Sequence, residues 1–105
     1  MTDTQDALSC LTLAFPAILE DEILDICHEM EGIEGFTILS AAGFGQGAVF
    51  RSVQEEVRGR AARRLLMTVT YDRHVKSLLA ELARRLPTPD VAYWITPVIG
   101  FGRLA

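Results

Sequence analysis

The sequence predicts an α+β protein whose strands and helices follow the order β-α-β-β-α-β. Four segments alternate apolar and polar side chains with the period of a strand, and two longer segments repeat apolar residues with the period of a helix. With right-handed crossovers this order gives the ferredoxin-like sandwich, in which two helices cover one face of a four-stranded antiparallel sheet. A chain of 105 residues can bury one core. We therefore expect a single domain over residues 1–105.

The first half of the chain predicts a strand, a helix and a second strand. Residues 8–15 place their large apolar side chains on one face, and Pro16 ends that strand. Residues 17–31 carry one apolar stripe, and acidic residues fill the first turn, where the helix dipole favours them. Gly32 suits the left-handed end of this helix, and residues 36–42 form the second strand. The stripe consists of Leu19, Ile23, Ile26, Cys27 and Met30.

The second half predicts a strand, a helix and a final strand. Residues 65–71 alternate and are rich in β-branched and aromatic side chains, as strands are. Asp72 is placed to cap a helix over residues 73–86, which two prolines terminate. The last strand covers residues 91–99. Because Pro97 has no N–H to donate, we expect an edge strand, or a strand that ends there.

Residues 43–64 form a polar, glycine-containing connection between the second and third strands. The connection is longer than a hairpin turn needs, and long connections of this kind are usually functional or disordered. Its arginines make it a positive feature on a chain of net charge −4, which suits an anion or an acidic partner. The alternative is a solvated loop whose charge only favours solubility. The arginines are Arg51, Arg58, Arg60, Arg63 and Arg64.

The face of the predicted sheet opposite the helices has an unusual composition. It is too rich in threonine for a core and too apolar for a face that meets only water. Burial against another subunit explains both properties, so Thr12, Thr68 and Trp94 are the predicted contact residues. The alternative is an exposed face on a monomer. The side chains assigned to this face are Cys10, Thr12, Thr37, Leu39, Thr68, Thr70, Trp94 and Thr96.

Composition and charge narrow the class of protein. A pI near 5.0 argues against a nucleic-acid partner, because phosphate contacts require a basic face. The first residues, MTDTQD, lack the basic and apolar regions of a secretory signal, and no apolar run approaches a membrane span. Cys10 and Cys27 have no CxxC spacing and sit in apolar segments, as reduced thiols do. We expect a soluble, cytoplasmic protein.

No set of residues predicts an enzyme. The segment GQGAVFR, from Gly45 to Arg51, is similar to the phosphate-binding segment of acylphosphatases, which share the predicted fold. In that family the segment follows the first strand, whereas here it follows the second, and the chain has no asparagine to orient an attacking water. The acidic residues of the first helix are explained by the helix dipole. We therefore expect a non-enzymatic protein.

A metal-binding or metal-sensing trimer is the alternative function. Its ligands would be Cys27, His28 and His74. Adjacent helical residues point about 100° apart, which hinders joint coordination by the first two, so a core thiol beside a surface imidazole is the simpler explanation. The heavy-metal-associated domain, of the same fold, requires a CxxC loop where this chain has FPAI. The sheet also lacks the paired aromatics of RNA-recognition domains.

Three motifs carry a resemblance to a known family. They are LEDEIL (19–24), EEVRGR (55–60) and YWITPVIGFGRL (93–104). With the element order, they resemble a small bacterial subfamily of the PII-like signalling proteins (nitrogen regulatory protein P-II superfamily), often encoded beside heavy-metal efflux pumps. The resemblance implies a homotrimer whose T-loop, here residues 43–64, binds a protein partner such as an efflux transporter. The partner-binding residues would be Arg51, Glu55, Glu56, Arg58 and Arg60.

The same resemblance leaves the ligand open. ATP-binding PII proteins hold phosphates with a loop rich in glycine and lysine, but residues 86–90, LPTPD, contain neither. No cofactor is identified, and we expect weak ATP affinity. A small anion or nucleotide would lie between Gly43, Gly45 and Gln46 of one subunit and Arg103 of its neighbour, because glycine lets backbone N–H groups approach an anion and arginine binds it through paired hydrogen bonds. The glycines could equally serve only to bend strand ends.

Overall fold

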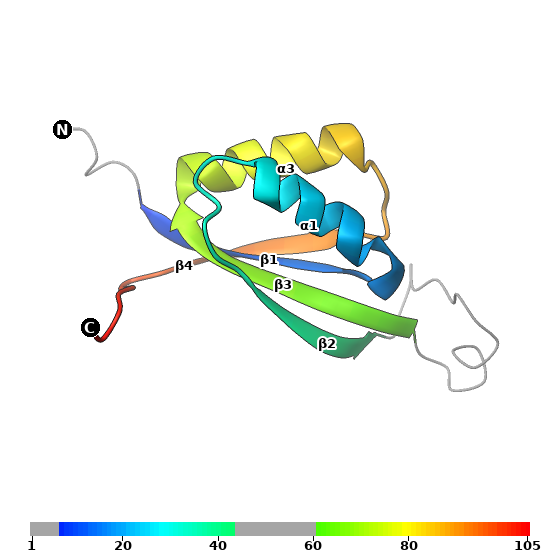
Figure 1. The fold of residues 1–105 in the computed structure, drawn as a ribbon, viewed down its shortest axis with the longest axis horizontal. Coiled ribbons are helices and arrows are strands. Elements are labelled where there is room, and N and C mark those ends of the chain that lie inside the picture. Colours follow the sequence, from blue (N-terminus) through cyan, green and yellow to red (C-terminus); the bar gives the residue numbers. More distant parts are fainter. Residues whose placement is uncertain (1–6, 44–60) are drawn as a thin grey trace.

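The structure is a computed structural model that describes residues 7–43 and 61–105. It contains four strands, two α-helices and one 3₁₀ turn in these parts of the chain (Figure 1). The elements are β1 (Leu8–Pro16), η2 (Ala17–Leu19), α1 (Glu20–Glu29), β2 (Thr37–Gly43), β3 (Ala61–Tyr71), α3 (Asp72–Arg85) and β4 (Ala92–Pro97).

The strands form one antiparallel sheet in the order β2-β3-β1-β4. Both helices lie on the same face of this sheet, as Figure 1 shows, and no described element covers the other face. This is the predicted α+β, ferredoxin-like arrangement, and the fold prediction is confirmed. β4 is an edge strand, as its proline requires, and ends at Pro97.

The core lies between the sheet and the helices. Leu11, Leu13 and Phe15 of β1 are fully buried, and so is Leu66 of β3 beside them. The helices cover these side chains with their apolar stripes, because a stripe of period 3.6 faces the sheet along the whole helix. The helical core residues are Ile23, Ile26, Cys27, Val75, Leu78 and Leu82.

The element boundaries differ from the prediction mainly at β3, which begins at Ala61 and not at residue 65. Its first residues, AARR, pair with the end of β2, so that Gly43 lies opposite Ala61. Charged residues are accommodated there because Arg64 Nε lies 2.8 Å from Glu20 Oε1 at the start of α1. The connection between β2 and β3 is therefore residues 44–60. The predicted helix over residues 17–31 is a 3₁₀ turn followed by a shorter α1.

Asp72 does not cap α3, so that prediction was wrong. Tyr71 occupies the N-cap position without a side-chain hydrogen bond, and Asp72 is the first helical residue. Its carboxylate instead accepts a hydrogen bond from the Ser9 hydroxyl, and its backbone N–H donates to the Ala7 carbonyl oxygen at 2.9 Å. The residue therefore ties the start of α3 to β1.

Thr68 and Thr70 were assigned to the wrong face of the sheet. Thr68 lies directly opposite Leu11, so both side chains project toward the helices. The Thr68 hydroxyl donates to the Gly35 carbonyl at 2.7 Å, and the Thr70 hydroxyl donates to the Gly32 carbonyl at 2.8 Å. The error has a simple cause. Both alternating sets of side chains in LLMTVTY contain apolar residues, so the sequence alone does not show which set faces the helices. Pairing with β1 decides it.

Candidate functional site

The face of the sheet that no described element covers, called here the outer face, is more apolar than predicted. Leu39, Met67 and Trp94 retain 46%, 37% and 47% of their surface exposed. Thr12 lies between Met67 and Trp94 on the neighbouring strands and is only 3% exposed. Thr12 and Trp94 therefore lie on the predicted face, whereas Thr68 does not. Their role in a subunit contact stays a prediction.

Residues 98–105, called here the C-terminal tail, follow β4. The Val98 N–H donates to the Leu8 carbonyl at 3.3 Å, and the tail then leaves the end of the sheet without regular structure (Figure 1). Its large apolar side chains are exposed: Phe101 to 62%, and Ile99 and Leu104 completely. An apolar segment this exposed is typical of a surface that another molecule covers.

A cavity of about 440 Å³ lies where the tail meets the end of the outer face. Met67 and Val69 of β3 line it from the sheet, Phe36 lines it from the approach to β2, and Phe101 lines it from the tail. Cys10 of β1 is a further lining residue. This space, called here the outer cavity, lies within the range of roughly 300–1,000 Å³ that is usual for small-molecule sites.

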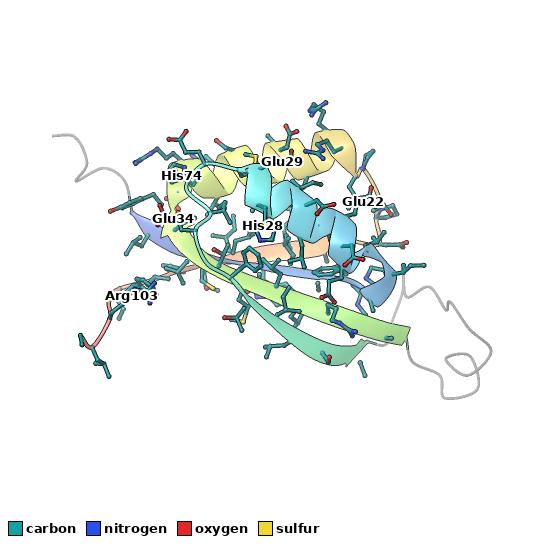
Figure 2. All side chains as sticks on the ribbon, viewed as in Figure 1. Glu22, His28, Glu29, Glu34, His74 and Arg103 are labelled. Atoms are coloured by element: carbon teal, nitrogen blue, oxygen red, sulfur yellow. The ribbon has the colours of Figure 1, made fainter. Side chains whose placement is uncertain are left out.

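Two charged residues also line the outer cavity. Arg103 extends from the tail, and Glu34 lies on the loop between α1 and β2 (Figure 2). Neither side chain forms a hydrogen bond or ion pair with any other residue that the structure describes. Most other cations of the described segments have partners, such as Arg64 with Glu20. The cavity therefore holds an available guanidinium beside an apolar wall.

The predicted ligand-binding residues do not meet within one chain. Arg103 lies at the cavity beside Thr37, where β2 begins, whereas Gly43 is at the other end of the same strand. Gly45 and Gln46 lie outside the described residues. The predicted cleft between neighbouring subunits therefore stays a prediction.

The predicted partner-binding residues also fall outside the described residues. The structure describes only the strand ends from which their segment departs, Gly43 and Ala61, which are neighbours in the β2–β3 ladder. The residues concerned are Arg51, Glu55, Glu56, Arg58 and Arg60.

The alternative metal ligands do not form a cluster. Cys27 is buried in the core, and burial raises the pKa of its thiol to about 11, which opposes the thiolate that a metal requires. His28 is exposed with its ring 5.4 Å from that of Phe36, and the His74 ring lies 6.4 Å from that of Tyr71. No three histidine, cysteine or acidic side chains within residues 7–43 and 61–105 could hold one ion. The geometry does not favour the metal-binding alternative.

Sequence reasoning missed most of the outer cavity. Its lining residues come from β1, the loop before β2, β3 and the C-terminal tail, and strand pairing together with the passage of the tail past the end of the sheet brings them close. One signal was available. Phe101 and Arg103 alternate with glycines after the last strand, which in an extended chain places both side chains on one side.

Comparison with known sequences assigns the chain to a family. Residues 4–105 match the sequence pattern of the family described as "Protein of unknown function (DUF3240)". The chain belongs to the DUF3240 family. No curated protein matches this DUF3240 sequence. No helix in the described segments is long and apolar enough to cross a membrane.

Solved structures share the fold of this DUF3240 chain. A DUF3240 family protein from Shewanella baltica superposes with a TM-score of 0.75 at 23% identity, over 94% of this chain and 98% of the other. A PII-like signalling protein from Thermus thermophilus gives 0.62 at 20% identity, over 87% and 85%. CPII, a nitrogen regulatory PII-like protein from Thiomonas intermedia bound to ADP, AMP and bicarbonate, gives 0.68 at 14%, over 91% and 96%. The predicted PII-like relationship is thus supported at the level of fold.

Proposed function

We propose that this DUF3240 protein is a PII-like regulatory protein that acts in the cytoplasm by binding, and not by catalysis. A small ligand at a subunit cleft would control the binding of a protein partner by residues 44–60, the part of the predicted 43–64 loop that lies between β2 and β3. The observation that carries the proposal is the combination of a fold shared with PII-like signalling proteins and an arginine-rich segment anchored at one sheet edge.

Assembly as a homotrimer is part of the proposal. The outer face exposes Leu39, Met67 and Trp94, and the C-terminal tail exposes Ile99 and Leu104. A monomer would leave all of this apolar surface in water, and burial stabilises by about 25 cal/mol per Å². Closed cyclic symmetry buries such a surface in every copy without leaving one exposed. The exposed faces support this arrangement.

The partner surface is proposed to be the segment that follows β2. Its ends are held side by side by the pairing of Gly43 with Ala61, and it carries Arg51, Arg58 and Arg60. Guanidinium groups bind carboxylates through paired hydrogen bonds, so the expected partner surface is acidic. A heavy-metal efflux transporter is the partner that the sequence resemblance suggests.

The regulatory ligand is proposed to be a small anion or nucleotide. CPII from Thiomonas intermedia contains ADP, AMP and bicarbonate. In this chain, Gly43, Gly45 and Gln46 of one subunit would meet Arg103 of the next. The loop 86–90 has no lysine, so the affinity for ATP should be low compared with PII proteins that have a phosphate-binding lysine.

A double substitution tests the partner surface. Arg58→Ala/Arg60→Ala should abolish the capture of a protein that the wild type retains, and the purified partner should reproduce this difference. Lys76→Ala is the control, because Lys76 is an exposed cation on α3 without a partner among the described residues. Unfolding of the double variant would make the arginines structural, and capture equal to wild type would remove them from the partner surface.

A further inference from the structure

A second cavity, called here the helix-side groove, lies on the opposite side of the sheet from the outer cavity. Its volume is about 280 Å³, and its walls are the C-terminal half of α3, the connection 86–91 and the sheet. Leu13 of β1 and Tyr93 of β4 line it from the sheet; they are paired residues whose side chains project toward the helices. Among the described residues, the two cavities have no lining residue in common.

The helix-side groove exists because the sheet extends one strand beyond the helix layer. On β1, the side chains of Leu11 and Leu13 that face the helices are fully buried. Their partners on the edge strand β4, Ile95 and Tyr93, face the same side but remain 44% and 56% exposed. The subunit contact proposed above uses the outer face, so it leaves this side of the sheet accessible.

The size of the helix-side groove indicates a small molecule and not a protein. An apolar cavity of about 150 Å³ holds benzene. The groove, with about 280 Å³, therefore accommodates a body of about two fused rings. A specific protein interface instead buries about 800 Å² on each partner, which one groove of this size does not provide. Leu79, Leu82 and Leu86 form its wall on the helix, and Pro87 and Val91 form its wall on the connection 86–91 (Figure 1).

The lining of the helix-side groove indicates a neutral ligand. No described acidic or basic side chain lines the groove. The arginines at the end of α3 are already engaged, since Arg84 binds Glu81 and Arg85 binds Glu29. An ionised ligand would therefore lose its hydration without gaining a partner for its charge, which is unfavourable.

One hydroxyl of the lining is available to orient such a ligand. The Thr88 hydroxyl oxygen accepts a hydrogen bond from the Asp90 N–H at 3.1 Å, which leaves the hydroxyl proton free to donate. That proton has no acceptor among the residues that the structure describes. Thr88 is half-buried, and every other lining side chain except Tyr93 is apolar. A carbonyl oxygen on the ligand would satisfy this donor.

We propose that the helix-side groove binds a neutral, mainly apolar molecule of about two rings that carries one carbonyl oxygen. The rings lie against Leu82 and Tyr93, and the carbonyl oxygen accepts a hydrogen bond from Thr88. Binding covers the apolar surface that α3 leaves open above β4. The site is distinct from the regulatory cleft, and its occupancy requires neither the nucleotide nor the protein partner.

Calorimetry with three matched probes tests the proposal on the full-length, assembled protein. The bicyclic ketone α-tetralone should bind, and tetralin, which lacks only the carbonyl oxygen, should bind about fivefold more weakly. The anion α-naphthoate should not bind, because its charge would have no partner in the groove. The absence of α-tetralone binding would overturn the proposal, and so would equal or tighter binding of α-naphthoate.

Substitutions at Thr88 test the hydrogen bond. Thr88→Val removes the hydroxyl but keeps the shape of the side chain, so α-tetralone and tetralin should then bind equally. Thr88→Ser keeps the hydroxyl and should retain the fivefold preference for the ketone. Comparing two probes on one variant cancels any general effect of the substitution on the connection 86–91. A preference for α-tetralone that survives Thr88→Val would overturn the proposed orientation.

Substitutions on α3 test the location. Ala83 is exposed and lines the groove, so Ala83→Phe should fill it and abolish the binding of α-tetralone. Ala80→Phe is the control, because Ala80 is exposed on the same helix but does not line the groove. Equal α-tetralone binding by both variants would overturn the assignment. A change in mass by light scattering for Ala83→Phe alone would also overturn it, because a second copy of the chain would then occupy the groove.

Discussion

Gly32 is the described residue whose replacement the structure opposes most directly. Its φ of +87° is in the left-handed region, which costs other residues about 1–2 kcal/mol. A Cβ at this position would lie 2.3 Å from the His74 ring. We expect Gly32→Ala to lower the free energy of unfolding by at least that backbone amount, measured by urea denaturation.

Two further variants separate the causes at Gly32. Gly35→Ala should change stability by less than about 0.5 kcal/mol, because a Cβ there meets no atom within 4 Å. Gly32→Ala/His74→Ala removes the obstructing ring, so the substitution should then retain only its backbone effect. If Gly32→Ala and Gly35→Ala are equally stable, the close packing of His74 on Gly32 is not real.

Cys27 should make stability depend on alkaline pH. Burial raises the pKa of its thiol from an ordinary 9.0 to about 11, so between these values the folded chain keeps a proton that the unfolded chain loses. The stability contribution is complete below pH 9 and is lost as pH rises toward 11. In denaturation curves, the gap between wild type and Cys27→Ala should narrow over this interval. A constant gap would contradict a buried, protonated thiol.

At the scale of elements, Thr68 provides a test of which face β3 presents to the helices. Thr68→Val removes the hydroxyl that donates to the Gly35 carbonyl, so it should lower stability by about 1 kcal/mol. Thr12→Val is the matched control on the outer face. It is equally buried, and its hydroxyl has no hydrogen bond among the described residues, so the change should be neutral or stabilising.

The outcome distinguishes a structural threonine from an interface threonine. If Thr68→Val left stability unchanged and altered the oligomeric mass, the side chain would face a subunit contact, as the sequence first suggested. Urea denaturation and light scattering on both variants provide the two measurements. The register of β3 predicts an effect on stability alone.

The order of elements could be predicted because local patterns carry it, but the phase of β3 could not. Leu11, Leu13 and Phe15 share one face and are flanked by small or polar residues, so β1 has one buried phase. In β3, Leu66 competes with Leu65 and Met67, and pairing with β1 decides between them. In a strand that is apolar on both sides, tertiary pairing therefore determines which side chains face the core.

The candidate site was also predictable only in part. Arg103 was predicted as a ligand-binding residue because it is the cation of the GFGR terminus and can bind an anion through paired hydrogen bonds. Its neighbours Glu34, Phe36 and Met67 could not be predicted, since they lie more than 35 residues away and come close only when the C-terminal tail meets the sheet. The chemistry of a single residue is visible in sequence, but the composition of a cavity is not.

At the scale of the whole molecule, Trp94 tests the proposed homotrimer. Trp94→Glu should reduce the mass measured by light scattering to that of one chain, because it places an unpaired charge in an apolar contact. Tyr93→Glu is the control: the neighbouring residue on β4 lies opposite Leu13 and so projects to the helix side. A wild-type monomer at micromolar concentration would reject the trimer, as would equal effects of both substitutions.

The reactivity of Cys10 should report the same assembly independently. Its thiol is partly exposed at the outer face of a single chain, whereas Cys27 is fully buried. A thiol reagent at pH 8 should therefore modify Cys10 slowly in the wild type and quickly in Trp94→Glu, and should spare Cys27 in both. Peptide mapping identifies the modified residue. Fast modification of Cys10 in the wild-type oligomer would mean that subunits do not cover this end of the outer face.

The pairing of Gly43 with Ala61 also bears on how proteins of this shape diversify. The segment between them leaves and re-enters the sheet at one pair of residues, so its ends stay neighbours whatever its length or sequence. The entropy of closing a loop grows only with the logarithm of its length, about 0.6 kcal/mol for each doubling. Insertions, deletions and exchanges between residues 44 and 60 should therefore leave the sandwich almost untouched. The partner-binding segment can therefore change faster in evolution than the sheet and helices, so that related proteins can bind different partners.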